Sequence, residues 1–192
     1  FMDNPNCFFS FYSIPEDQIP VPELLKNKDK RADTAARVAV QSAANALKGI
    51  SAIDLTSLNV VVVNREGCKG HISKVTNSIK KNQPAQGFFV RGGPQTLATY
   101  TALALGSHGA AFTFVGDQKI LKDAITTACY LACNTKKSAT LLTVIVKKKD
   151  AGYQASTVLA LSNGHRFETV SSLLEQKMHN YLSQAFDMEI VQ

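Results

Sequence analysis

The sequence predicts an α/β protein whose mixed, mostly parallel sheet is covered by helices on both faces. Four apolar runs rich in β-branched residues have the length of strands, and most are separated by segments with helical spacing. The runs are continuous rather than alternating, which is typical of strands buried on both sides. The last two follow one another directly, so that pair can be antiparallel. The four runs are residues 58–63, 111–115, 139–146 and 153–161.

Length and composition fit a single domain over residues 1–192. Hydrophobic residues make up 45% of the chain and charged residues 19%, which excludes a disordered or membrane-spanning protein. The start of the chain carries no basic-then-apolar leader, so we expect no secretion. The four cysteines show neither paired spacing nor histidine partners. We therefore expect no metal and a reducing, cytoplasmic setting.

The net charge of +6 favours an acidic partner. The lysines cluster at the expected ends of helices and strands, where solvated positions explain most of them. No motif for nucleic acids, phosphate-cradling loops or cofactors accompanies them. We expect neither nucleic-acid binding nor membrane binding, and no cofactor.

Residues 1–30 are expected to be irregular, because four prolines exclude a long helix. Aromatic residues in this segment are expected to anchor it to the body of the domain. A helix over residues 33–48 carries a stripe of small residues and ends at Gly49. The prolines are Pro5, Pro15, Pro20 and Pro22, and the aromatic anchors are Phe8, Phe9, Phe11 and Tyr12.

The middle of the chain adds a strand, a glycine-bearing loop over residues 64–70 and two helices. The first of these helices ends at the polar pair Lys80 and Lys81, and the second spans residues 94–105. Between them lie two adjacent aromatic residues, Phe88 and Phe89, before a double glycine. These two rings are either plain core or the lining of a pocket or interface.

The central stretch, residues 106–133, combines a strand, a sharp turn and a helix start. Residues 111–115 are expected to form a strand buried on both faces, and Gly116 and Asp117 then break the pattern. Asp117 can cap the helix that begins at Gln118. Many α/β enzymes place a nucleophile at such a corner. The corner is here either an ordinary strand–helix joint or an active-site elbow without its nucleophile.

The chain is expected to end in an amphipathic helix over residues 170–186. Its apolar face needs either the body of the domain or a partner to cover it.

Residues 31–161 resemble the N-terminal half of a β-ketoacyl synthase, a thiolase-like fold. Residues 31–47 resemble the family's alanine-rich first helix, and residues 58–70 its first strand and glycine loop. Residues 86–128 resemble the segment that leads through the nucleophile elbow. Residues 139–146 and 155–161 resemble the last strands of that half. The order and spacing of these segments carry the resemblance.

The resemblance places the family's catalytic cysteine at Gln118, and neither Cys129 nor Cys133 falls at the elbow. The family's two histidines come from the second half of its fold. His71, His108, His165 and His179 match neither of them. The resemblance therefore implies a subunit that performs no covalent acyl transfer.

Glutamine at this position is typical of chain-length factors, the non-condensing subunits of type II polyketide synthases. These subunits pair with an active ketosynthase. The chain is shorter than a usual chain-length factor, which fits the small partner subunits of aryl-polyene-type synthases. The glutamine is either a polar filler or, as in some relatives, linked to decarboxylation of a malonyl group.

The resemblance also implies two contact surfaces. The strand with Phe112 and Phe114 would lie at the subunit interface, and Phe88 or Phe89 would wall the partner's acyl tunnel. Basic side chains would dock the acidic acyl carrier protein, namely Lys28, Lys30, Arg31, Lys80 and Lys81. Two alternatives stay open: an independent thiolase-like acyl-transfer enzyme that uses Cys68 or Cys129, and a stand-alone carrier-binding module.

Overall fold

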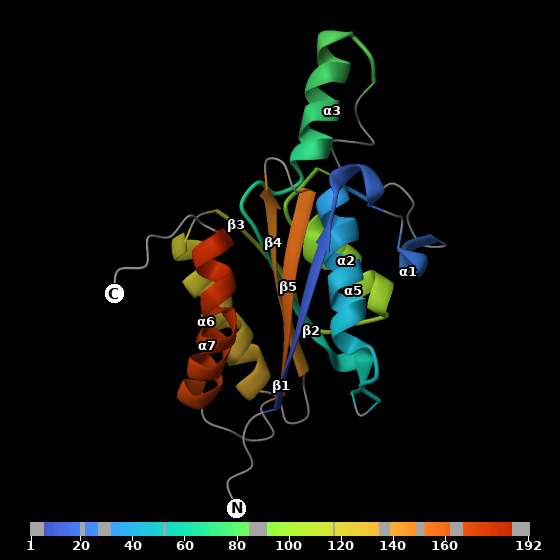
Figure 1. Cartoon of the computed structure of the whole chain (residues 1–192). Coiled ribbons are helices and arrows are strands. Elements are labelled where there is room, and N and C mark those ends of the chain that lie inside the picture. Colours follow the sequence, from blue (N-terminus) through green and yellow to red (C-terminus); the bar gives the residue numbers. More distant parts are fainter. Residues whose placement is uncertain are drawn as a thin grey trace, which may run out of the picture.

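The protein, seen here in a computed structural model, is a three-layer α/β/α sandwich (Figure 1). The structure describes residues 6–19, 22–26, 32–51, 53–84, 92–116, 118–134, 139–148, 152–161 and 167–185. The described strands form one five-stranded sheet in the order β1-β5-β4-β2-β3. They are β1 (Asn6–Ile14), β2 (Asn59–Asn64), β3 (Ala111–Val115), β4 (Ala139–Lys148) and β5 (Gly152–Leu161).

Strand β5 runs antiparallel to both of its neighbours, β1 and β4, while β2 is parallel to both β4 and β3. The other four strands therefore share one direction. This arrangement confirms the predicted mixed, mostly parallel sheet, including the antiparallel pairing of its last two strands.

Helices cover both faces of the sheet, as predicted. Figure 1 shows α2 and α5 on one face and α6 and α7 on the other, while α3 projects beyond one end of the sheet. No described helix combines the length and apolar character needed to cross a bilayer. The helices are α1 (Glu23–Lys26), α2 (Thr34–Leu47), α3 (Lys69–Lys80), α5 (Thr96–Leu105), α6 (Gln118–Asn134) and α7 (Phe167–Ala185), with 3-10 turns at Glu16–Gln18 and Leu55–Ser57.

Strand β2 lies in the sheet interior, and all six of its residues are buried. Val60 and Val62 belong to the apolar cluster under α2 and α5, and Val61 and Val63 to the cluster under α6 and α7. Successive side chains of a strand point to opposite faces, so a strand covered on both sides needs a continuous apolar run. The run of four valines therefore fits a strand that is buried on both faces.

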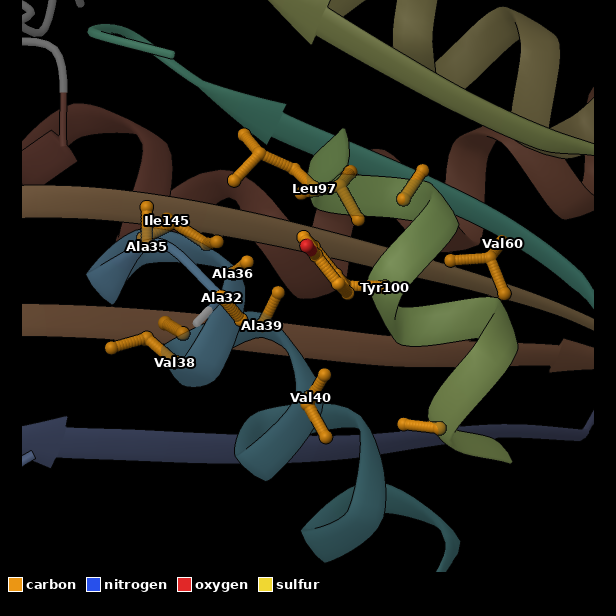
Figure 2. Close-up of a cluster of buried hydrophobic side chains, with 14 of the residues drawn as sticks. Ala32, Ala35, Ala36, Val38, Ala39, Val40, Val60, Leu97, Tyr100 and Ile145 are labelled. Atoms are coloured by element: carbon orange, nitrogen blue, oxygen red, sulfur yellow. The ribbon is translucent and has the colours of Figure 1, made fainter. Parts of the chain in front are cut away.

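The alanines of α2 let this helix pack closely on the sheet. Figure 2 shows Ala35, Ala36 and Ala39 of α2 in the same cluster as Leu97 and Tyr100 of α5. Small side chains leave room for close approach, and the larger residues of α5 and of the strands fill the remaining volume. On the other face, α7 packs through Val170, Leu174 and Met178. The body of the domain thus covers the face of α7 that carries these residues.

Strand β1 contradicts the expectation that residues 1–30 are irregular. Asn6–Ile14 pair with β5 along their whole length, from Asn6 opposite Leu161 to Ile14 opposite Tyr153. The prolines flank this segment rather than interrupt it, and its aromatic residues favour strands. Tyr12 and Ile14 pack against the core. The expected anchors Phe8, Phe9 and Phe11 are instead exposed.

Strand β3 is a strand as predicted, but it is not buried on both faces. It occupies one edge of the sheet, where β2 is its only partner among the described strands. None of its five residues is buried, and Phe112 is 44% exposed. An apolar run that is exposed at a sheet edge is typical of a surface that a partner covers.

Candidate functional site

The corner between β3 and α6 is the centre of the candidate site. Strand β3 ends at Val115, and α6 begins at Gln118. Gly116 has a φ of 153°, and a Cβ there would lie 2.6 Å from Cγ1 of Ile120. Only glycine allows the chain to turn so tightly against the first turn of α6. The predicted sharp strand-to-helix corner is therefore present, and Gln118 is the first residue of its helix.

The backbone of the corner could bind an oxygen with partial negative charge. The first N–H groups of an α-helix have no partner within the helix, and the helix dipole adds positive potential there. The residue at this point is an amide, which can donate hydrogen bonds but is no nucleophile. Asp117, the expected cap, lies outside the described residues.

A loop at the end of β2 borders the corner. Because β2 and β3 are parallel neighbours, Asn64 lies opposite Val115. The loop packs over the end of β3, since a Cβ on Gly67 would lie 3.6 Å from both methyl groups of Val115. The buried Asn64 holds the start of the loop by accepting a hydrogen bond of 2.6 Å from the Glu66 backbone N–H.

Asp33 joins this loop region to the first long helix. Its Oδ1 accepts from the backbone N–H of Ala35 at 3.0 Å, which caps α2. Its Oδ2 accepts from the backbone N–H of His71, also at 3.0 Å, in the first turn of α3. Helix α3 has no side-chain hydrogen bond from its own N-cap residue, Cys68. One buried carboxylate therefore caps two helices, and the second cap reaches His71, 38 positions further along the chain.

Cys68 lies in the same region but is not an available nucleophile. It is only 1% exposed, and its Sγ lies 3.0 Å from Oγ1 of Thr96. Burial raises the pKa of the Cys68 thiol to about 11, against a smaller lowering by the Thr96 hydrogen bond. Catalytic thiols need the opposite environment, with a stabilised thiolate and access to substrate.

Cys129 and Cys133 also lack the environment of a nucleophile. Cys129 is fully buried within α6. Burial raises the pKa of the partly buried Cys133, and the Glu168 carboxylate adds to that effect. The predicted position of both residues away from the corner agrees with their place in the later turns of α6.

The remaining predicted site residues are only partly described. Phe88, Phe89, Lys28, Lys30 and Arg31 lie outside the described residues, and the side chain of Gln118 is not described.

Phe112 and Phe114 lie on the same face of β3, where Phe114 packs against the cluster under α6 and α7. Lys80 and Lys81 are exposed at the far end of α3, which projects away from the sheet (Figure 1). The structure therefore does not bring these two lysines to the corner.

Neither His71 nor His108 is placed as a catalytic base at the corner. His71 is 2% exposed, in the first turn of α3 beside Asp33, and His108 lies on the surface before β3. Within the described ranges, no group of three or more His, Cys, Asp or Glu residues could hold a metal ion.

Sequence reasoning missed the double capping role of Asp33. An Asp before an alanine-rich helix is a recognisable N-cap signal for α2. The second hydrogen bond, to His71, depends on tertiary structure and leaves no local signal.

No family model matches the sequence, and no curated protein matches it. Among solved structures, the chain is similar to one chain of the complex of the ketosynthase ApeO with its chain length factor ApeC from Xenorhabdus doucetiae. The TM-score is 0.58 and the sequence identity is 11%, and the match covers 83% of this chain and 80% of that chain. The likeness shows a ketosynthase-type, thiolase-like fold, which confirms the predicted fold class.

Proposed function

We propose that this chain is a non-catalytic, chain-length-factor-like subunit that pairs with an active ketosynthase. In this proposal it shapes the tunnel in which its partner elongates an acyl chain held on an acyl carrier protein. The observation that carries the proposal is Gln118 at the first position of α6, directly after the edge strand β3. The resemblance places the nucleophilic cysteine of active ketosynthases at this residue.

The fold comparison supports the choice of partner. The similar chain comes from an assembly of a ketosynthase with its chain length factor. The match covers about four fifths of each chain, so the two chains have similar lengths. This similarity in length favours the small-subunit interpretation, in which the partner is a type II, aryl-polyene-type ketosynthase.

Strand β3 supplies the surface for this partner. Phe112 is 44% exposed and Val115 is 38% exposed on a strand that is paired on one side only among the described strands. Pairing would bury aromatic surface and satisfy the backbone groups of the edge. It would also bring the corner at Gln118 close to the partner.

The chemistry of the corner supports a subunit that makes no carbon–carbon bond. Covalent acyl transfer needs an activated nucleophile and a base within reach. An amide occupies the position of the nucleophile, and Cys68 is buried with a raised pKa. Gln118 is proposed as a polar filler rather than as a group that promotes decarboxylation.

Two further parts of the proposal concern the acyl chain and its carrier. Phe88 or Phe89 walls the partner's tunnel, so that side-chain volume limits product length. The acidic carrier docks on basic side chains, because α3 carries three lysines and no acidic residue. Surface charges of this kind act mainly on the rate of association. The proposed docking residues are Lys28, Lys30, Arg31, Lys80 and Lys81.

We place the complex in the cytoplasm, where Cys68, Cys129 and Cys133 would persist as free thiols.

Co-expression with the cognate ketosynthase tests the proposal. We expect the two chains to co-elute on size-exclusion chromatography, and only the pair to elongate acyl chains on carrier protein. Gln118→Ala in this chain should leave the activity of the pair unchanged, whereas alanine at both Phe88 and Phe89 should shift the product length. Elongation by this chain alone, or loss of activity in Gln118→Ala, would contradict the proposed role.

The carrier-binding module is the second candidate function, because α3 projects from the body as a basic helix (Figure 1). This candidate predicts carrier binding without any ketosynthase and no co-elution with one. Titration of labelled carrier protein into the chain alone, with Lys80→Glu and Lys81→Glu as the paired variant, separates the two functions. The proposed subunit needs its ketosynthase for productive carrier binding.

A further inference from the structure

Strand β1 forms the second edge of the sheet and has the features of an interface. It lies opposite the β3 edge, with β5 as its partner on one side (Figure 1). Its sequence, Asn-Cys-Phe-Phe-Ser-Phe-Tyr-Ser-Ile, contains no charged residue and no proline. Natural edge strands are usually protected by charges, prolines, bulges or a covering element. A nine-residue aromatic edge strand without a charge or proline is therefore expected to pair with another strand.

Three phenylalanines are exposed along this edge. Phe8 is 42% exposed, Phe9 is 44% exposed and Phe11 is 52% exposed. Phe9 lies opposite Val158, which belongs to the cluster under α6 and α7, so Phe9 and Phe11 share that face. Phe8 is on the other face, together with Tyr12. The edge thus offers apolar surface on both sides of the strand.

We infer that β1 binds β1 of a second copy of this chain, in an antiparallel pair related by a two-fold axis. The inference rests on the strand itself and does not depend on the proposed function. A two-fold axis perpendicular to the sheet keeps the same face of both copies on the same side. Directly opposed residues must therefore point to the same face, so both are odd-numbered or both are even-numbered. Placing the axis at Ser10, the central residue of Asn6–Ile14, gives the longest overlap.

This register is self-complementary. It sets Phe9 opposite Phe11 of the second copy and Phe11 opposite Phe9 of the second copy. Four phenylalanines then meet on the α6 and α7 face, while Phe8 lies opposite Tyr12 of the second copy on the other face. Directly opposed aromatic residues are among the favourable cross-strand pairs of antiparallel sheets.

Charge and buried area favour a second copy as the occupant. The chain carries a net charge of +6, yet β1 has no charge, so self-pairing opposes no like charges within the strand. Complete burial of the exposed parts of Phe8, Phe9 and Phe11 in both copies removes roughly 550 Å² of aromatic surface. A specific interface needs about 1,000 Å². In the proposed dimer, the remaining area would come from the two strand backbones and the side chains that flank them.

A charge-swap experiment with the purified full chain tests this register. Phe9→Lys with Phe11→Lys places like charges opposite each other in a self-pair, and Phe9→Glu with Phe11→Glu does the same. In a mixture of the two variants, each lysine faces a glutamate. We expect a dimer of the unmodified chain by sedimentation equilibrium, monomers for each double variant alone, and a dimer again for the mixture.

The other sheet edge provides the matched control, because Phe112 is exposed to the same extent as Phe9. Phe112→Lys should leave the dimer intact. A monomeric unmodified chain, a mixture that stays monomeric, or a Phe112→Lys variant that loses the dimer would overturn the inference.

A cross-link keeps the test independent of the folding of the charged variants. The same register sets Cys7 opposite Ser13 of the second copy, and directly opposed residues in antiparallel strands lie within disulfide range. Under mild oxidation, Ser13→Cys should give a covalent dimer through Cys7, and Ser13→Cys combined with Cys7→Ser should not. Absence of the dimer in the first variant, or its presence in the second, would refute this register.

Discussion

At the scale of single residues, the buried side chains of the loop region hold neighbouring parts of the fold together. Asp33 accepts two backbone hydrogen bonds, one from each of two helices. Gly70 must be small beside it, because a Cβ there would lie 2.8 Å from Oδ2 of Asp33. Cys68 completes the region as a buried thiol against Thr96. A cluster of Asp, His and Cys side chains can suggest a catalytic site, but this one attaches α3 to the domain.

Asp33→Ala should lower the free energy of unfolding by about 2 kcal/mol, since each lost helix cap costs roughly 1 kcal/mol. Asp33→Asn should cost about half as much, because its single carbonyl oxygen can replace only one of the two carboxylate acceptors. Urea denaturation of the three proteins measures the difference. Equal stability of the Ala and Asn variants would contradict the double cap.

The Cys68 thiol should resist alkylation in the folded protein. Its pKa is raised from 9.0 to about 11, so at neutral pH its thiolate fraction is about 100-fold below that of an unperturbed cysteine. Burial slows the reaction further. Iodoacetamide labelling followed by mass spectrometry, with and without urea, measures the protection. Rapid labelling of native Cys68 at neutral pH would revive the alternative of an independent enzyme.

The raised pKa of Cys68 also predicts that the folded protein loses stability at high pH. The thiol ionises near pH 9 in the unfolded chain and near pH 11 in the folded one. The stability that it contributes is therefore complete below about pH 9 and is lost as the pH rises towards 11. A Cys68→Ser variant should show a smaller loss of stability over that interval.

At the scale of secondary structure elements, local patterns predicted most helices and the interior strands. The four valines of β2 and the alanines of α2 carry clear signals. A strand buried on both faces needs a continuous apolar run, and a closely packed helix needs small side chains. Gly116 likewise indicated the corner before α6.

The two edge strands were harder to predict. Strand β1 pairs with residues 152–161, far along the chain, and the prolines around it suggested a loop. The apolar run of β3 is the same whether neighbouring strands or a partner cover it, so its exposure could not be predicted.

The β3 edge yields a prediction for assembly. Phe112→Lys should lower the affinity for the ketosynthase at least 10-fold, because a buried charge at an interface costs more than about 1.4 kcal/mol. The stability of the isolated chain should hardly change, since Phe112 is largely exposed. Analytical size-exclusion and thermal melting report the two quantities. Phe9→Lys, on the opposite edge, is the control that should keep the ketosynthase bound.

At the scale of the whole molecule, the sequence predicted the layered α/β architecture and the resemblance predicted the thiolase-like half-fold, both of which the structure confirms. It predicted less about how the parts of the site meet. The hydrogen bond from His71 to Asp33 and the burial of Cys68 arise only when α2, α3 and α5 are packed together. Local spacing contains no information on such long-range contacts.

With both proposed contacts in place, the positions of β1 and β3 at opposite margins of one sheet would give the chain two binding edges. Three strands separate these margins, so an occupant of one need not compete with an occupant of the other. A contact through β1 is isologous and is used up once two copies have met. Growth into filaments would then stop at a closed assembly, in which two ketosynthases are held at the far ends of one continuous ten-stranded sheet.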